Sequence, residues 1–365
     1  MIMTDIGVQR LKSQRVMPPT FTSAAEVVRW LGAVQAQDFL GSLWAIGSRM
    51  QDATEQMIEQ AIAERTIVRT WPMRGTVHFV PAEDARWMLN LLTPRVVSRS
   101  QSIYRQLGLD QAVMARSHDV VTRALSGGKT LRRNDLYAEL EAAGIATGDM
   151  RGLHIIGQLA QAALICFGPR SGKQPTFTLL DEWAPNQRAL SGEEAIAELV
   201  VRYFRSHGPA TIHDFMWWTG LTMAEARPAI EAMQSQLVGE TIDGKTYWWT
   251  DDTPGVEPHS PALYLLPPFD EYLVSYKDRS PSLEPANTFV AAPDRHLGSI
   301  IVIDGRVVGL WKRTFKKDTV TIEATCGRDL TEAEIEAFEA AARRYAAFVG
   351  MPTLHTSIKS SVAGA

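Results

Sequence analysis

The sequence has little cysteine, no long apolar run and no excess of positive charge. Cys166 and Cys326 are its two cysteines, and neither has a second cysteine nearby. This excludes a disulfide framework and a cysteine-based zinc site. No segment stays apolar for the roughly 20 residues that a membrane-spanning helix needs, and the first residues lack the apolar core of a secretion signal. We therefore expect a cytoplasmic protein that is neither secreted nor embedded in a membrane.

The net charge of −4 gives no indication of a nucleic-acid partner. Local blocks differ from this average: "RVVGLWKRTFKK", from Arg306 to Lys317, contains no acid, and "PRVVSRSQSIYR" places Arg95, Arg99 and Arg105 on one expected helix. Such blocks can neutralise phosphates while acidic faces elsewhere cancel the sum. A solvated surface is the alternative interpretation of each block.

Several kinds of chemistry are not supported by the motifs. The stretch "GPRSGKQ" has the wrong spacing for a phosphate loop and ends on Gln174 instead of Ser or Thr. His78, His154 and His213 have no spacing typical of metal ligands. No dinucleotide fingerprint occurs, so we expect neither a cofactor nor a metal.

One pattern recurs along the chain: a helix, a short turn, two more helices and then two strands. In the middle of the chain we expect helices over 111–125, 131–144 (with Thr130 as its cap) and 151–165, then strands "ICFG" and "TFTLL" joined by the basic hairpin "PRSGKQP". A further copy runs from "EEAIAELVVRYFRSHG" to the strands around "GETIDGKTYWWT". The first copy has helices near 7–15, 24–34 and 55–63, followed by "TIVRTWP" and "GTVHFV". Three helices with a two-stranded wing are typical of a winged helix-turn-helix.

Beyond the third copy, the run "DDTPGVEPHSP" predicts a linker, and alternating apolar residues predict strands. The sequence "IDGR" predicts a type I′ hairpin, residues 332–348 an amphipathic helix, and "HTSIKSSVAGA" a loose tail. The expected fold class is α+β: three tandem winged-helix modules and a small C-terminal β-barrel or sheet with a terminal helix. The expected boundaries are 1–93, 94–190 and 191–250 for the modules, 262–350 for the C-terminal domain and 351–365 for the tail.

The stretch "GAVQAQDFLGSLW" places two amides, Gln35 and Gln37, two residues apart at the end of an apolar helix. In an extended backbone, side chains two residues apart project to the same side, whereas in a helix they diverge. The alternative is a helix C-terminus whose amides satisfy unpaired carbonyls.

Four stretches, "VQAQDF", "RTWPMRGTVHFV", "LLPPFDEYLVSYKDR" and "GLWKR", together resemble the signatures of the winged-helix DNA glycosylases called AlkZ-like or YcaQ-like. The resemblance implies three tandem winged helices with a C-terminal β-barrel. It also implies hydrolysis of the N-glycosidic bond of N7-alkylated purines, including those that anchor interstrand crosslinks. The family's catalytic motif of glutamine, apolar residue and glutamine falls on Gln35, Ala36 and Gln37. Some members carry a carboxylate at the second position, so this chain is closer to the crosslink-unhooking branch.

The chemistry implied by the resemblance suits two amides. Alkylation at N7 makes the purine cationic, so the base leaves as a neutral molecule without a general acid. Two amide side chains can fix one water beneath the anomeric carbon, although neither can act as a base. Asp38 could stabilise the sugar cation or accept a proton, or it could instead cap the helix that begins near Phe39.

Basic residues give candidate DNA contacts. Arg69 and Arg74 flank an expected turn at Pro72, with salt bridges to Glu64 or Asp84 as the alternative. The full set of candidates is Arg69, Arg74, Arg132, Arg133, Arg170, Lys173, Lys312, Arg313, Lys316 and Lys317. We expect "GPRSGKQP" or "KRTFKK" to contact the minor groove, within a cleft open enough for crosslinked strands.

Asp270 and Glu271 are expected to pair with Lys277 or Arg279 in a mainly structural role.

The expected partner of the protein is double-stranded DNA with alkylated or crosslinked purines, bound by a monomer. Two other functions stay open from the residues alone: a non-catalytic regulator, which would usually be a symmetric dimer, and a protein-interaction scaffold.

Overall fold

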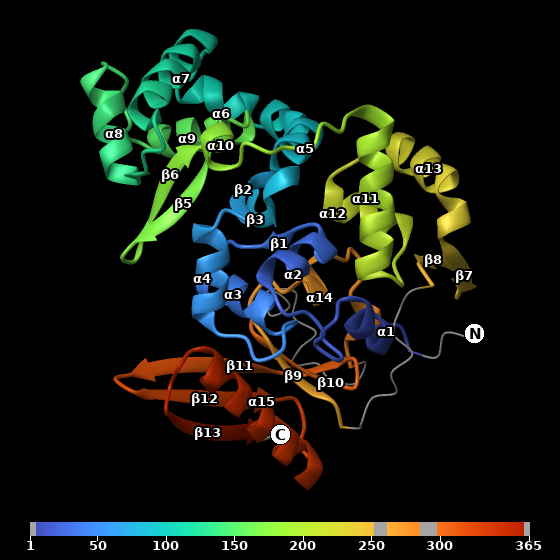
Figure 1. Ribbon diagram of the computed structural model, residues 1–365. Coiled ribbons are helices and arrows are strands. Elements are labelled where there is room, and N and C mark those ends of the chain that lie inside the picture. Colours follow the sequence, from blue (N-terminus) through green and yellow to red (C-terminus); the bar gives the residue numbers. More distant parts are fainter. Residues whose placement is uncertain (1–4, 252–260, 285–297, 361–365) are drawn as a thin grey trace. The chain divides into compact units, whose positions relative to one another are not determined.

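The computed structural model describes residues 5–251, 261–284 and 298–360. The predicted linker lies almost wholly at 252–260, outside the described residues. The chain has a mixed α+β fold and divides into two compact units, which are considered separately (Figure 1). Unit 1 comprises Met1–Ile58 and Ala197–Ala365, and unit 2 comprises Glu59–Ile196.

Unit 2 is built on a sheet whose strands run in the order β3-β2-β5-β6-β4. The strands are β2 (Ile67–Met73), β3 (Thr76–Pro81), β4 (Leu131–Arg132), β5 (Ile165–Ser171) and β6 (Gln174–Leu179). The helices are η1 (Ala82–Asp84), α5 (Ala85–Arg99), α6 (Gln101–Gln106), α7 (Gln111–Leu125), α8 (Arg133–Ala142), α9 (Arg151–Gln161) and α10 (Leu180–Trp183). Helices α5 and α9 pack against β2. The helix α4 (Glu55–Ala63) leads into this unit from unit 1.

Three expectations for unit 2 are wrong in detail. The expected single helix carrying Arg95, Arg99 and Arg105 is divided, because α5 ends at Arg99 and α6 begins at Gln101. Thr130 does not cap α8, because the short strand β4 intervenes and the N-cap is Arg132. Pro72 lies within β2, and the turn falls instead at Arg74 and Gly75, which both have positive φ. The predicted β5–β6 hairpin is confirmed, with its turn at Gly172 and Lys173.

Unit 1 contains an open five-stranded sheet in the order β13-β12-β11-β10-β9, and a separate β7–β8 pair. Its strands are β1 (Val34–Gln35), β7 (Val238–Ile242), β8 (Lys245–Trp249), β9 (Leu263–Leu266), β10 (Ile300–Ile303), β11 (Arg306–Lys316), β12 (Thr319–Cys326) and β13 (Thr353–Ser360). Its helices are α1 (Ile6–Ser13), α2 (Ala24–Leu31), α3 (Phe39–Gly47), α12 (Ile212–Thr219), α13 (Met223–Ala232), η2 (Gln234–Gln236), α14 (Glu271–Val274), η3 (Ser280–Ser282) and α15 (Glu332–Phe348). The helix α11 (Gly192–His207) leads into it from unit 2.

The large sheet of unit 1 settles two expectations. The type I′ turn at "IDGR" is confirmed, since Asp304 and Gly305 both have positive φ between β10 and β11. In the described residues the sheet does not close into a barrel, so of the two predicted forms the open sheet is present.

The expected loose tail is wrong for residues 353–360, which form β13. This strand pairs in parallel with β12 over its whole length, from Thr353 to Ser360. Its side chains are mostly exposed or half-buried, so backbone hydrogen bonds hold it in place more than apolar burial does. That is why the absence of an apolar pattern was misleading.

The core of unit 1 lies where α1 and α14 pack on the sheet. Its buried apolar side chains are Leu11, Val16, Met17, Leu266, Tyr272, Leu273, Ile300, Val302 and Val307. The first part of unit 1 is thus joined to its last part through a shared core.

Candidate active site and nucleic-acid interface

The two amides of the motif lie on non-helical backbone. Helix α2 ends at Leu31, and Gly32 follows with a φ of 80°, a conformation that favours glycine. The chain then runs extended through β1. The expected helix through Val34 is therefore too long, whereas the non-helical backbone that the motif requires is present.

Gln35 and Gln37 differ in exposure. The side chain of Gln35 is buried, with 7% of its surface exposed, and Gln37 is exposed in the bend that follows. The Oε1 atom of Gln35 is shielded from solvent and has no hydrogen-bond partner among the described residues. A buried acceptor without a donor costs about 1–3 kcal/mol. Gln35 therefore offers an acceptor that a small hydrogen-bond donor would satisfy.

The backbone at Gln35 is held by an acid from a distant part of the chain. The amide N–H of Gln35 donates to Oε1 of Glu271 at 2.7 Å. The second oxygen of Glu271 accepts from Nε1 of Trp218 at 3.3 Å and from the hydroxyl of Ser275. Nε2 of His207 lies 3.6 Å from the same oxygen. Glu271 is fully buried, so these donors replace water around it.

The neighbouring acid, Asp270, is anchored elsewhere. The guanidinium of Arg49 donates to its two oxygens at 2.9 and 3.0 Å and to Oε1 of Gln14 at 2.7 Å. The expected pairing of the two acids with Lys277 or Arg279 is therefore wrong. Apart from Ser275 and the backbone N–H of Tyr272, their partners are far away in the sequence, and no local pattern indicated them.

Burial lowers the pKa of His207 below its ordinary value of 6.5, and the nearby Glu271 only partly offsets this shift. The ring of His207 stacks on Tyr203, with 4.9 Å between the ring centres. The imidazole is therefore held in its neutral form near neutral pH.

Asp38 has a clear structural role. Its side chain accepts from the backbone N–H of Gly41 at 2.9 Å and caps α3. This is the capping alternative that the sequence suggested. A catalytic part for Asp38 stays a prediction.

In unit 2 the candidate DNA contacts lie along one sheet. Arg69, on β2, places its guanidinium 4.3 Å from the ring centre of Phe167, and Arg74 approaches His78 at 3.4 Å. Because β2 and β5 are antiparallel, the turn at Arg74 and the turn at Lys173 lie at opposite ends of the sheet. The structure therefore does not bring these two residues together.

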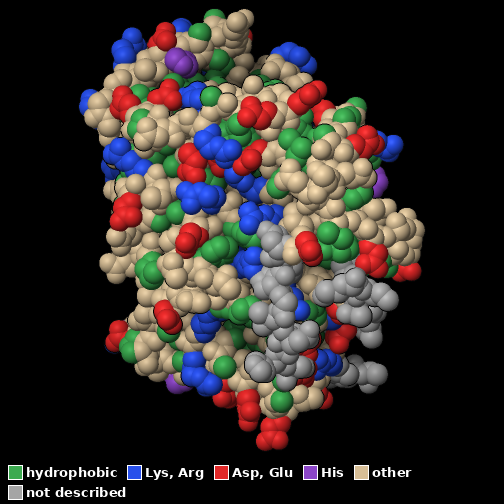
Figure 2. Space-filling view, turned by 45° about the vertical axis from the view of Figure 1, so that its right-hand side comes forward, with side chains coloured by type: hydrophobic (Ala, Val, Ile, Leu, Met, Phe, Trp, Pro, Cys, Tyr) green, Lys and Arg blue, Asp and Glu red, His purple; other side chains and the backbone are tan. Residues whose placement is uncertain are grey.

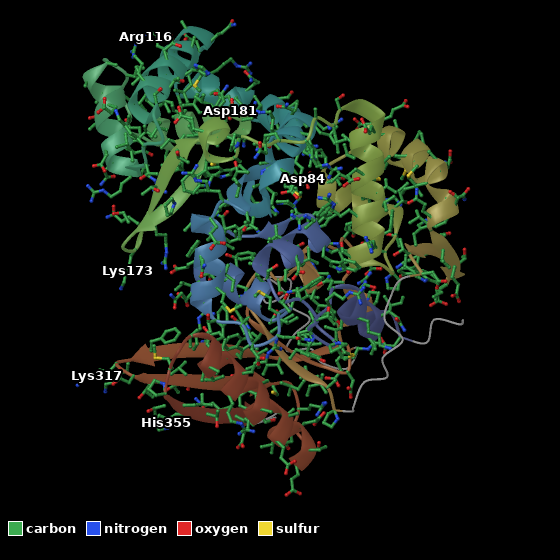
Figure 3. The ribbon with its side chains drawn as sticks, viewed as in Figure 1. Asp84, Arg116, Lys173, Asp181, Lys317 and His355 are labelled. Atoms are coloured by element: carbon green, nitrogen blue, oxygen red, sulfur yellow. The ribbon has the colours of Figure 1, made fainter. Side chains whose placement is uncertain are left out.

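Two other candidates in unit 2 already have acidic partners. Arg132 pairs with Asp135 at 2.8 Å, and Arg170 pairs with Glu59. Lys173 and Arg133 are exposed. Lys173 lies at the tip of the β5–β6 hairpin, from which its side chain projects (Figure 3).

In unit 1 the candidates follow β11 toward its end. Lys312, Lys316 and Lys317 are exposed, and Arg313 is half-buried with its guanidinium 5.6 Å from the ring centre of Tyr345. Lys317 lies at the tip of the β11–β12 hairpin (Figure 3). Figure 2 shows Lys and Arg side chains interspersed with Asp and Glu over the face that it draws, in keeping with the slightly negative net charge.

None of the helices in the described ranges combines the length and the apolar character needed to cross a bilayer.

Comparison with known proteins adds to this geometry. The sequence model of the family described as DNA glycosylase AlkZ-like matches residues 28–348. The chain belongs to this family of DNA glycosylases. The expected enzyme class is thereby confirmed. A curated relative, the interstrand DNA cross-link repair glycosylase of Streptomyces sahachiroi, is 26% identical over 334 residues, which cover 86% of this chain and 88% of the relative.

The solved structure of the Streptomyces sahachiroi DNA glycosylase AlkZ is similar to this chain, with a TM-score of 0.79 at 23% identity. The match covers 97% of this chain and 98% of that one. This likeness shows that the two proteins share the mixed α+β fold.

Proposed function

We propose that this protein is a monofunctional DNA glycosylase that hydrolyses the N-glycosidic bond of N7-alkylated purines in duplex DNA and unhooks interstrand crosslinks. Family membership and the name of the curated relative support the reaction and the type of lesion. The observation that carries the assignment of the site is the buried, unpartnered Oε1 of Gln35 on extended backbone.

In the proposed mechanism, the Gln35 side chain turns when DNA binds, so that its Oε1, shielded in this structure, accepts a hydrogen bond from the attacking water. Gln37 follows two residues later from an exposed position and offers its amide to the same water. The cationic purine departs as a neutral base, so the site needs no general acid. The amides only orient the water, and they leave its proton to solvent or to Asp38, whose contribution remains a prediction.

We also propose that the chain contains three winged-helix modules, over 1–93, 94–190 and 191–250. The three copies share one order: a helix, a short strand or bridge, two helices and two strands. The first copy is α2, β1, α3, α4, β2, β3, and the second is α7, β4, α8, α9, β5, β6. The third is α11, the bridge at Ala210, α12, α13, β7, β8. The first copy runs across the boundary of the two compact units. The position that β1 holds in the first copy is held by Leu131–Arg132 in the second and by Ala210 in the third. Of the three copies, the first carries the glutamine pair.

For DNA binding, we propose that the hairpin tips at Lys173 and Lys317 contact the phosphates or the minor groove. Both lysines are exposed at turns between antiparallel strands. Their charges can neutralise phosphates without a net positive charge on the whole protein. The partner is duplex DNA with alkylated or crosslinked purines, and we expect the protein to act as a monomer.

The test is base release from a duplex that carries N7-methylguanine or a nitrogen-mustard crosslink, followed as abasic-site formation. The double variant Gln35→Ala/Gln37→Ala should lose release by about 100-fold or more, because a misplaced nucleophile costs about that factor. DNA affinity should stay within a few-fold. Gln51→Ala, at an exposed position in the same unit, is the matched control and should release base at the wild-type rate.

Two outcomes would contradict the proposal. Normal release by the double variant would place the site elsewhere in the chain. Salt-sensitive binding by the wild type without any release would favour the non-catalytic regulator.

A further inference from the structure

We infer that Glu271 is a positioning residue for the glycosylase site, and that it acts through the backbone of Gln35. This inference rests on the proposed function. It extends that proposal to a residue outside the glutamine motif, on a helix that lies 236 positions away along the chain.

The contact itself has the features of a strong hydrogen bond. The N–H of Gln35 meets Oε1 of Glu271 at 2.7 Å, and Glu271 is fully buried. Hydrogen bonds to carboxylates are shorter and roughly twice as strong as those between neutral groups. In this shielded position, water does not compete for the bond.

The second oxygen of Glu271 is surrounded by groups from α11, from α12 and from the residue that directly follows α14. Trp218 on α12 and the hydroxyl of Ser275 donate to this oxygen, and His207 on α11 lies 3.6 Å from it. The hydrogen bonds from Trp218 and Ser275 limit the orientations that the carboxyl group can take. A movement of α11, α12 or α14 would therefore move the carboxylate, and the carboxylate would move the backbone of the short strand β1.

This strand needs such support because it is only two residues long and follows a glycine. Val34–Gln35 begins two residues after Gly32, where α2 ends. A strand of two residues can form only a few backbone hydrogen bonds, so a side-chain acceptor on one of its N–H groups adds to what holds the Gln35 backbone. The bond to Glu271 fixes the peptide from which the Gln35 side chain departs, and so fixes the direction of its Cα–Cβ bond, from which the unpartnered Oε1 is reached.

The nearby Asp214 provides a matched control. It is also fully buried in unit 1 and is surrounded by hydrogen bonds, from Thr211 and from the backbone N–H groups of Lys277 and Asp278. Like Glu271, Asp214 is a buried acid whose removal should destabilise the fold, but it makes no hydrogen bond to Gln35 among those described.

The decisive experiment is a double-mutant cycle on the single-turnover rate of base release. Glu271→Ala should slow release by about 10- to 100-fold, while the dissociation constant for DNA changes only a few-fold. If Glu271 acts through Gln35, adding Glu271→Ala to Gln35→Ala should slow release no further, because the effects of coupled residues do not add. Glu271→Gln, which keeps one acceptor oxygen for the Gln35 N–H, should recover part of the rate.

A purely structural role would give different results. Asp214→Asn and Glu271→Ala would then both lower the melting temperature and leave the single-turnover rate of the folded protein unchanged. Additive losses in the cycle would also overturn the inference. Should Glu271→Ala fail to fold, Ser275→Ala removes one of the donors that hold the carboxylate and should slow release moderately.

A spectroscopic measurement separates this inference from the proposed function. The amide proton of Gln35 should resonate far downfield in wild-type protein and move upfield in Glu271→Gln, because a neutral acceptor weakens the bond. The absence of such a shift would overturn the inference even if the enzyme is active. If instead the shift occurs but wild-type protein releases no base, the proposed function fails while the bond stands.

Discussion

Gly32 lies where α2 ends and the extended Gln35 segment begins, and its backbone shows what that change of direction requires. Its φ is 80°, and an added Cβ would lie 2.8 Å from Cδ of Arg202. An alanine in place of Gly32 would therefore have a strained backbone and would also displace the side chain of Arg202. The direction in which the backbone enters the glutamine motif therefore depends on Gly32.

Gly32→Ala should lower the free energy of unfolding by about 1–2 kcal/mol and also slow base release, because β1 would shift. Urea unfolding and a single-turnover assay measure the two effects. Gly220→Ala is the matched control, since Gly220 has a similar φ of 77° at the end of α12 but open space around its Cβ. Alanine should cost less conformational energy there, because Gly220 has a ψ of 9° in the left-handed region whereas Gly32 has a ψ of −42°, and it should not slow release. Equal slowing in both variants would contradict the argument.

His207 should make the stability of the protein depend on pH, with a loss of stability at acidic pH. Burial lowers the pKa of its imidazole below 6.5, so below that pH the unfolded chain binds a proton that the folded chain does not. Stability should therefore be full above about pH 7 and fall as the pH drops from about 6.5 toward 5. The charged and titratable groups around the ring are Glu271, Arg49, Tyr203 and Tyr276.

Urea unfolding at about pH 5.5 and pH 7.5 measures this loss. A His207→Gln variant should be less stable overall, yet its stability should change less between the two pH values. An equal pH dependence in both proteins would assign the effect to other groups.

The residue scale also shows the limit of what sequence can predict. The glutamine pair could be found because its members are two positions apart and accompany other signatures, and the cap at Asp38 follows from a local rule. The bond from Gln35 to Glu271 could not, because a buried acid takes whichever donor the folded chain brings to it. For the same reason Asp270 pairs with Arg49, although Lys277 and Arg279 are closer in sequence.

At the scale of elements, β13 is the edge strand that the sequence did not predict. It covers the edge of β12 by parallel pairing over eight register positions, and its side chains contribute little burial. An uncovered strand edge is prone to pair with other chains. The last strand is thus a protective element of the sheet.

A chain that ends at residue 352 should melt at a lower temperature and aggregate, because β12 would be left with an unpaired edge. Thermal melting with light scattering measures both effects. A chain that ends at residue 360 keeps β13 and should behave like the full chain. Equal stability of the two truncated chains would show that β13 does not protect the sheet.

Elements specified by short-range rules were predicted well, and those set by distant partners were not. The type I′ turn at Asp304 and Gly305 and the helix α7 follow from turn residues and apolar spacing. The strand β4 instead exists because it pairs with β6, over forty positions later. This pairing is why the expected cap at Thr130 was wrong.

At the scale of the whole molecule, the net charge of −4 requires DNA binding to depend on local groups. Lysines at the hairpin tips are suited to this, whereas Arg132 and Arg170 already have acidic partners. An ion-paired cation is less available to a phosphate, because contact with DNA would require it to leave its acidic partner.

Lys173→Ala and Lys317→Ala should each weaken DNA binding and reduce the slope of log affinity against log salt by about one. Fluorescence anisotropy at several salt concentrations gives the slope. The control is Lys245→Ala, since Lys245 pairs with Asp278 at 2.6 Å and should leave the slope nearly unchanged. An unchanged slope for Lys173→Ala or Lys317→Ala would remove that lysine from the DNA contact.

Unit 1 is assembled from the first 58 residues and from a stretch that begins at Ala197. During synthesis on the ribosome, Gln35 emerges long before Glu271, the acid that its backbone binds. Until most of the chain has been made, the segment around Gln35 therefore lacks its bond to Glu271 and has only local structure. A nascent or prematurely terminated chain would consequently contain the glutamine motif without the bond to Glu271, so that, if the motif is the hydrolytic centre as proposed, DNA would meet this centre in working form only after Glu271 has been made.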